Sequence, residues 1–86
     1  MFYRVVTGVV AQRLGDEMVL IHPKTDRIFL LNRTGARVWE LLSDQLDLDG
    51  TQEKLCQEFG GDPDQIRRDV EQIVFSLTKE QFIDQS

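Results

Sequence analysis

The stretch RIFLLNRTGARVWELL, residues 27–42, decides the fold, because an apolar repeat of two residues changes there into a helical repeat. Within a strand, Ile28 and Leu30 point to one face, and Phe29 and Leu31 point to the other. A sheet with one solvent-exposed face needs only one of these pairs to be apolar. The stretch also contains no Pro or Lys that would prevent another strand from pairing with it at a sheet edge. An unguarded strand that is apolar on both faces predicts that another segment pairs with it.

Three predicted strands lie before or within this stretch, at residues 5–12, 17–22 and 27–31. Gly15 and Asp16 predict a tight turn after the first strand, and the segment PKTD at 23–26 predicts a second turn. Connections this short indicate an antiparallel meander with the first and third strands at its edges. Gly8 predicts a bulge or bend in the first strand, so the third strand is the better docking edge.

Three predicted helices follow the change of period. The first covers about residues 34–44, with Asn32 or Thr34 as its cap. The second begins with Thr51 as its cap and ends at the glycines 60–61. The third covers about residues 63–79, because Asp62 is a suitable cap and Pro63 suits the first helical position.

The third predicted helix carries one apolar stripe, at a spacing of about 100° per residue. Its members are Ile66, Val70, Ile73, Val74 and Leu77. Phe75 falls on the opposite side of the helix. It is either an exposed aromatic residue that binds a partner protein, or it covers the C-terminal tail. The remaining apolar anchor is the pair Phe82 and Ile83 near the end of the chain.

Length, composition and charge limit the class of protein. The chain has 86 residues, of which 41% are hydrophobic and 29% charged, so we expect one globular domain over residues 1–86. A net charge of −5 and scattered basic residues argue against nucleic-acid binding. No apolar run is long enough to span a bilayer, no signal peptide is visible, and one cysteine permits no internal disulfide. We therefore expect a cytoplasmic protein.

Three strands followed by three helices predict an α+β domain of winged helix-turn-helix type, in which a three-stranded antiparallel sheet precedes three helices. The alternative is an arrangement of two short layers with a different strand order.

The candidate catalytic and metal-binding residues do not combine into a site. His22 is the only histidine and is interpreted as a turn residue, and Cys56 is interpreted as a small buried hydrophobe. The acidic residues lack the spacing of a calcium loop, and Asp64 and Asp69 are interpreted as solvated. We therefore expect no metal, no cofactor and no enzymatic activity.

The remaining candidate site combines the third strand with the third helix. The free N–H and C=O groups of an edge strand can bind an extended peptide by strand addition. The stripe of the helix can serve both the core (Val70, Val74, Leu77) and a groove (Ile66, Ile73), or all of it can be core.

The same residues resemble a known family. Leu31 and Asn32 end the strand, the segment TGA at 34–36 follows, and an apolar-Trp-x-Leu-Leu helix comes next at 38–42. Together with Asp62-Pro63 and the segment RDV at 68–70, this order resembles the PqqD-like proteins, also called precursor-peptide recognition elements. The resemblance covers about residues 5–83.

The resemblance implies a function without catalysis, the capture of the leader segment of a ribosomally made precursor peptide for a modifying enzyme. It implies that the leader adds to the third strand and lies against the last helix. The corresponding peptide-binding residues in this chain are Arg27, Ile28, Phe29, Leu30, Ile66, Asp69, Val70 and Ile73. From the alternation we expect Phe29 and Leu31 to face the core and Ile28 and Leu30 to lie nearer the other face.

Two subtypes of the family and two rival functions stay open. The start of the first helix favours lasso-peptide maturation, with a separate cysteine-protease-like leader peptidase as partner. The alternative subtype serves a radical-SAM enzyme in quinone-cofactor biosynthesis. The rival functions are those of a winged-helix DNA-binding protein and of a structural module that forms a homodimer through the third strand. We expect the chain to be a monomer or a weak homodimer.

Overall fold

The computed structural model describes residues 2–85, which form two antiparallel sheets and three helices. In chain order the elements are β1 (Tyr3–Val5), β2 (Val10–Leu14), β3 (Glu17–Ile21), β4 (Ile28–Leu31), α1 (Arg33–Ser43), α2 (Leu48–Phe59), α3 (Pro63–Lys79) and β5 (Ile83–Gln85). The larger sheet has the order β2-β3-β4, and β1 pairs with β5. The predicted α+β class, with a three-stranded antiparallel sheet followed by three helices, is confirmed.

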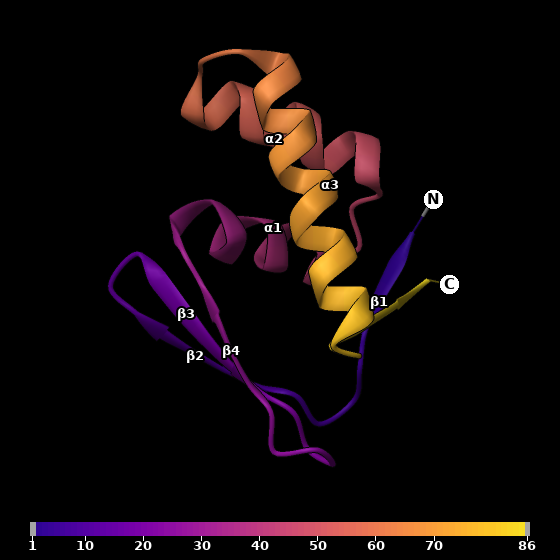
Figure 1. Cartoon of the computed structure of the whole chain (residues 1–86). Coiled ribbons are helices and arrows are strands. Elements are labelled where there is room, and N and C mark those ends of the chain that lie inside the picture. Colours follow the sequence, from indigo (N-terminus) through magenta and orange to yellow (C-terminus); the bar gives the residue numbers. More distant parts are fainter. Residues whose placement is uncertain (1, 86) are drawn as a thin grey trace.

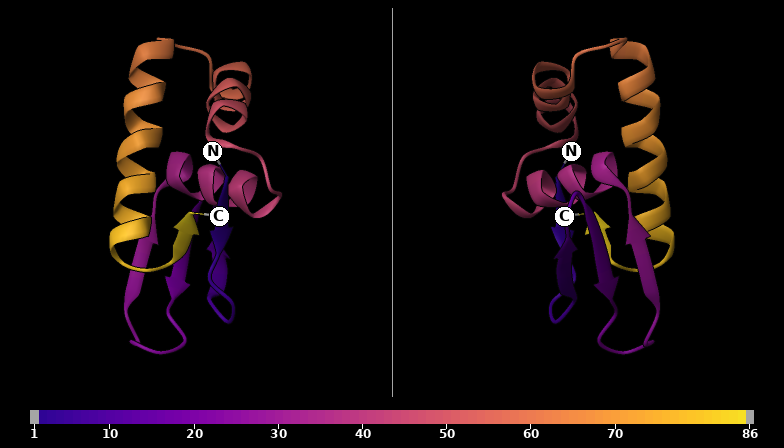
Figure 2. Two further views of the ribbon diagram at one scale, coloured as in Figure 1. Left: turned by 90° about the vertical axis from the view of Figure 1, so that its right-hand side faces the viewer. Right: turned by 90° about the vertical axis from the view of Figure 1, so that its left-hand side faces the viewer.

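The three helices lie on one side of the sheet β2-β3-β4 and leave its other side uncovered (Figure 1). In both views of Figure 2, α3 stands on the same side of the molecule as β4. The core fills the space between this sheet, the helices and β5. Its fully buried large side chains are Leu20, Val38, Leu42, Leu55, Val70, Leu77, Phe82 and Ile83.

The predicted first strand, at residues 5–12, is wrong because the structure divides it into β1 and β2. Gly8 lies between them with φ of +91°, and a Cβ there would lie 3.2 Å from the side chain of Pro23. This position therefore requires glycine, and the chain turns there instead of bulging. β1 pairs with β5 in the register Tyr3↔Gln85 to Val5↔Ile83, a contact that was not predicted.

The helix caps agree with the prediction at two helices and disagree at one. Asn32 caps α1, because its Oδ1 accepts a hydrogen bond from Gly35 N at 2.9 Å. Asp62 caps α3 and accepts from Asp64 N at 3.0 Å. The predicted cap of α2 is wrong. Asp47 is the cap, so Thr51 lies inside the helix, where its buried hydroxyl has no hydrogen-bond partner among residues 2–85.

His22 connects the turn between β3 and β4 to the end of α3. Its Nδ1 accepts hydrogen bonds from the backbone N–H groups of Lys24 at 3.1 Å and Thr25 at 3.3 Å. The proton therefore lies on Nε2, which donates to the carbonyl oxygen of Gln81 at 3.0 Å. The imidazole is buried and packs edge-on against Phe82. His22 is a turn residue, as predicted, and it also fixes the distance between the hairpin and α3.

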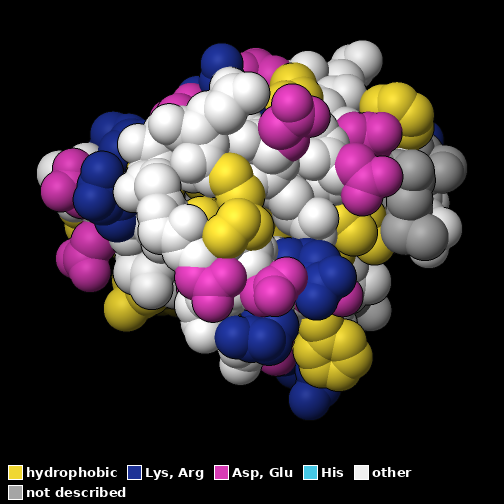
Figure 3. Space-filling model, turned by 90° about the horizontal axis from the view of Figure 1, so that it is seen from above, with side chains coloured by type: hydrophobic (Ala, Val, Ile, Leu, Met, Phe, Trp, Pro, Cys, Tyr) yellow, Lys and Arg dark blue, Asp and Glu magenta, His cyan; other side chains and the backbone are white. Residues whose placement is uncertain are grey.

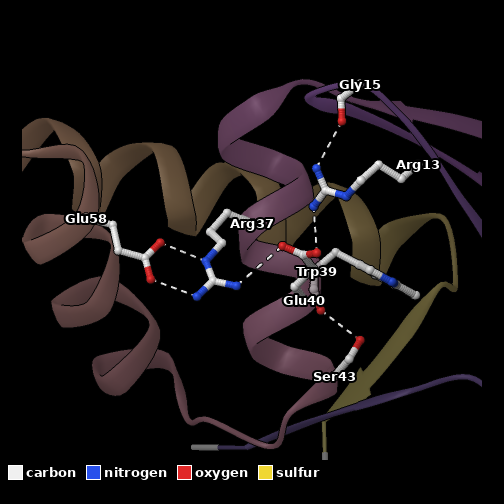
Figure 4. Close-up of polar contacts among 7 residues, drawn as sticks. All are labelled: Arg13, Gly15, Arg37, Trp39, Glu40, Ser43 and Glu58. Atoms are coloured by element: carbon white, nitrogen blue, oxygen red, sulfur yellow. Dashed lines mark hydrogen bonds and ion pairs between the residues drawn. The ribbon is translucent and has the colours of Figure 1, made fainter.

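Arg37 joins α1 to α2 through two hydrogen bonds to the carboxylate of Glu58, each 2.7 Å long (Figure 4). Glu40 accepts from Arg13 at 2.6 Å and from Arg37 at 3.4 Å. The hydrogen bond from Arg37 lowers the pKa of Glu58, and the hydrogen bond from Arg13 is the main cause of the lowered pKa of Glu40. The hydrogen bonds of Arg37 to Glu58 and, to a smaller extent, to Glu40 raise the pKa of Arg37.

Replacing His22 by Ala should lower the free energy of unfolding by about 2 kcal/mol, because three polar partners lose their hydrogen bonds. The measurement is urea denaturation followed by circular dichroism. The exposed neighbour Lys24 provides the control, because Lys24→Ala should change stability by less than about 0.5 kcal/mol. Equal effects of the two substitutions would contradict the role given to the imidazole.

Replacing Arg37 by Met should destabilise the protein by about 1 kcal/mol near neutral pH. The folded state lowers the pKa of Glu58, so this contribution is present above the pKa of the unfolded state and is lost as the pH falls through the folded pKa. The stabilities of the two proteins, measured by urea titration, should therefore converge as the pH falls below the usual pKa range of a Glu carboxyl. A difference in stability that stays constant with pH would mean that Arg37 acts only through packing.

Candidate functional site

A groove of about 510 Å³ lies between β4 and α3. One wall is the edge of the sheet, the other wall is one face of α3, and the start of α1 closes one end. The lining residues are Glu17, Phe29, Leu30, Leu31, Asn32, Thr34, Gly35, Asp69, Gln72, Ile73 and Ser76. The predicted combination of third strand and third helix is therefore the place where the structure has a groove.

The backbone of β4 has one paired side and one open side. β4 is an edge strand, and its register with β3 places Leu20 opposite Phe29 and Ile21 opposite Ile28. The hydrogen bond from His22 N to Arg27 O, 2.9 Å long, identifies the hydrogen-bonded pairs, because such pairs alternate along an antiparallel ladder. Phe29 therefore bonds to β3, and the N–H and C=O groups of Ile28 and Leu30 point away from it.

The side chains of β4 alternate as the sequence predicted. Leu31 is 4% exposed and Phe29 is half-buried against Phe82, whereas Ile28 is 67% and Leu30 is 73% exposed. Ile28 and Leu30 lie on the uncovered face of the sheet with Val10, Val19 and Ile21. Ile28 and Leu30 therefore offer their backbone groups to the open edge, while their side chains lie on the outer face.

The start of α1 explains why the groove ends where it does. Gly35 lies so close to β4 that a Cβ on it would be 3.0 Å from Leu31 Cδ2. The cap of Asn32 holds this turn in place, since its side chain bonds to the N–H of Gly35. The segment from Asn32 to Gly35 thus lets the helix start directly at the strand end, and this junction closes the groove.

An ion pair fixes the other end of the groove. Arg27, just before β4, pairs with Glu80, just after α3. His22 connects the same two regions through its contact with Gln81. The spacing between β4 and α3 is therefore set from both ends, and the wall residues between these ends lie on rigid elements.

The charged residues that line the groove are acidic. Asp69 and Glu17 contribute carboxylates, and no Lys or Arg lines the groove. Asp69 is half-buried, and its Oδ1 accepts a hydrogen bond from Gln65 Nε2 at 2.9 Å. Neither Asp69 nor Glu17 forms an ion pair with any residue among 2–85. The groove is thus suited to uncharged or basic groups.

The structure separates the predicted peptide-binding residues into three groups. Those that line the groove are Phe29, Leu30, Asp69 and Ile73. Arg27, just before β4, and Ile28, its first residue, do not line the groove. Val70 is fully buried and Ile66 is 9% exposed, so the placement of Ile66 in the groove is wrong and the side chains of both belong to the core.

Gln72 and Ser76 also line the groove on α3, and neither was predicted from the sequence. The signal was their spacing of three and seven residues from Asp69, which places all three on one helix face. Phe75 is 68% exposed and does not line the groove. Of the two interpretations of Phe75, the structure therefore favours the exposed aromatic.

Other kinds of site find little support in residues 2–85. They contain no group of three or more His, Cys, Asp or Glu placed to hold a metal ion. None of the helices described is long and apolar enough to cross a membrane. On the face formed by α2 and the start of α3, the basic side chains lie in separate small groups among acidic ones (Figure 3). This distribution does not provide the continuous basic surface that nucleic acid requires.

The chain is similar to proteins of known family and structure. The sequence model of the family Coenzyme PQQ synthesis protein D (PqqD) matches residues 17–83. The structure of TbiB1 in complex with the TbiA(beta) leader peptide is 25% identical, with a TM-score of 0.87 over 96% of each chain. A lasso peptide synthetase B1 complexed with the leader peptide is 20% identical, with a TM-score of 0.86 over 99% of this chain and 100% of the other. No curated protein matches the chain.

The alternation along β4 predicts a pattern of amide hydrogen exchange. The amides of Phe29 and Leu31 bond to β3 and should exchange slowly, whereas those of Ile28 and Leu30 face solvent and should exchange fast. Hydrogen exchange followed by two-dimensional NMR measures all four amides in one sample. Protection at Ile28 and Leu30 in the isolated protein would mean that the edge is already paired.

Proposed function

Because the chain belongs to the PqqD family, we propose that it binds the leader segment of a ribosomally synthesised precursor peptide. The leader adds as a strand to the open edge of β4 and lies against α3. One observation carries this proposal, the unpaired backbone groups of Ile28 and Leu30 beside a groove of about 510 Å³. The match of the family model over residues 17–83 supports it.

Strand addition gives this site two separate tasks. The backbone groups of β4 align the leader without reading its sequence, while pockets beside the strand read alternate side chains. Phe29 and Ile73 form the apolar part of the groove, because both are half-buried and pack against the core. A disordered leader loses conformational entropy on binding, so these side-chain contacts must supply much of the affinity.

The protein acts without catalysis and hands the bound leader to a separate enzyme. Residues 1–86 work as a single recognition domain in this proposal, and no cofactor takes part. Binding raises the concentration of the precursor near the enzyme, which needs no chemistry from this chain. The lasso peptide synthetase B1 among the similar structures supports a role in lasso-peptide maturation, with a leader peptidase as the partner enzyme. The description of the family supports the alternative, a peptide chaperone in quinone-cofactor biosynthesis.

A homodimer through β4 is the rival that one observation favours, because the open edge of one copy can pair with that of another. Such a dimer would use the same backbone groups of Ile28 and Leu30, so it would compete with the leader. Analytical ultracentrifugation with and without peptide separates the two cases. A dimer that persists at saturating peptide would exclude strand addition at this edge.

The first test is fluorescence anisotropy with the labelled leader of a precursor encoded beside this protein. We expect saturable binding in the micromolar range or tighter, and no binding of a scrambled leader. Leu30→Pro should weaken binding about tenfold or more, because it removes an outward N–H and distorts the edge. Ala11→Pro is the matched control, since the ladder places the N–H of Ala11 at the opposite edge of the sheet. Equal losses in both variants would contradict addition to β4.

A second pair of variants tests the wall formed by α3. Ile73→Asp places a charge in the groove and should reduce leader binding, whereas Phe75→Asp changes an exposed position outside the groove and should not. Circular dichroism of both variants establishes that the helix is intact. Binding that responds to Phe75 and not to Ile73 would move the site to the other face of α3.

A further inference from the structure

The carboxylate of Asp69 forms no ion pair with any residue among 2–85. Its side chain is half-buried in the wall of the groove, where a carboxylate is less well solvated than at the open surface. Gln65 binds Oδ1 and so orients the carboxylate, and Gln65 is itself held by Arg68 at 3.1 Å. The second oxygen, Oδ2, has no hydrogen-bond partner among residues 2–85, and a ligand in the groove can reach it.

The repeat of α3 matches the repeat of an added strand. Side chains on one face of a strand recur about every 6.7 Å, and four residues of a helix advance about 6 Å. Asp69 and Ile73 are four residues apart on the groove face of α3, and Ser76 follows one turn later. Consecutive groove-facing residues of a bound peptide therefore meet Asp69, then Ile73 and then Ser76, or the reverse.

We propose that the groove selects peptides in which a Lys or Arg stands two positions from an apolar residue, both facing α3. The basic side chain pairs with Asp69, and the apolar one packs against Ile73 and Phe29. This inference rests on the proposed function and adds the chemistry of the peptide that the site accepts.

The charge of the groove as a whole favours a cation over an uncharged donor. Glu17 adds a second carboxylate, no basic residue lines the groove, and the chain has a net charge of −5. A peptide N–H or hydroxyl could satisfy Oδ2 by itself, but it would leave the field of both carboxylates unbalanced. A basic side chain both bonds to Asp69 and neutralises this field.

The experiment selects binders from a phage-displayed library of random linear peptides. The three baits are the wild-type protein, Asp69→Lys and Glu71→Lys. Glu71 lies on α3 outside the groove, so its variant makes the same change in net charge without altering the groove. Wild type and Glu71→Lys should both enrich a basic residue two positions from an apolar one. Asp69→Lys should enrich an acidic residue at the same place.

Affinity measurements on one selected peptide give the magnitude. Asp69→Asn should weaken its binding about fivefold at low salt, and the difference should shrink between about 0.1 M and 1 M salt. Exchange of the basic residue of the peptide for Glu should weaken its binding to wild type. The same exchange should strengthen its binding to Asp69→Lys.

The possible failures are distinguishable. If wild type selects peptides that Leu30→Pro does not bind, and these lack a basic residue, the groove binds peptides but Asp69 does not read their charge. In that case Asp69 bonds to a backbone N–H or a hydroxyl, and the inference is overturned while the proposed function stands. If every peptide that wild type selects also binds Leu30→Pro, or if wild type selects none, the inference and the proposed function are both overturned.

Discussion

The alternation of hydrogen bonds along β4 is the constraint on which the rest of the structure depends. Phe29 and Leu31 bond to β3, and their side chains pack on the core side of the sheet. The same geometry turns the backbone of Ile28 and Leu30 outward. A shift of the register by one residue would expose the core pair and bury the others, so folding itself fixes which groups stand at the edge. The open edge is therefore a consequence of the core.

The position of α3 beside this edge depends on contacts made far from the groove. Phe82 is fully buried three residues after the end of α3, and its N–H bonds to the carbonyl oxygen of Leu77, so the end of the helix cannot move without opening the core. His22 and Arg27 hold the same end from the hairpin, through Gln81 and Glu80. The groove thus lies between two walls that contacts of the folded chain already hold in place, and a ligand need not assemble them. This preorganisation reduces the cost of binding.

Local signals in the sequence were sufficient for much of this structure and not for all of it. The period change at Asn32 and the Asp62-Pro63 start depend on neighbouring residues, and both predictions are confirmed. The pairing of β1 with β5 joins the two ends of the chain, and three-residue strands carry no local signal for it. The stripe on α3 is also ambiguous, since helical spacing does not say how wide the buried face is. Ile66 and Val70 lie inside that face, whereas Ile73 and Asp69 lie at its margin and form the groove.

Backbone pairing alone is too weak for the proposed function, which explains why the groove matters. At about 1 kcal/mol for each hydrogen bond, the N–H and C=O groups of Ile28 and Leu30 together contribute about 4 kcal/mol. Micromolar affinity corresponds to about 8 kcal/mol, and ordering a flexible peptide costs about 1 kcal/mol or more for each residue. The side chains in the groove must therefore supply the larger share. In the proposed function, such a site accepts any extended chain weakly and retains only those whose alternate residues fit Phe29, Ile73 and Asp69. Selectivity for the leader then follows from the weakness of backbone pairing at the edge.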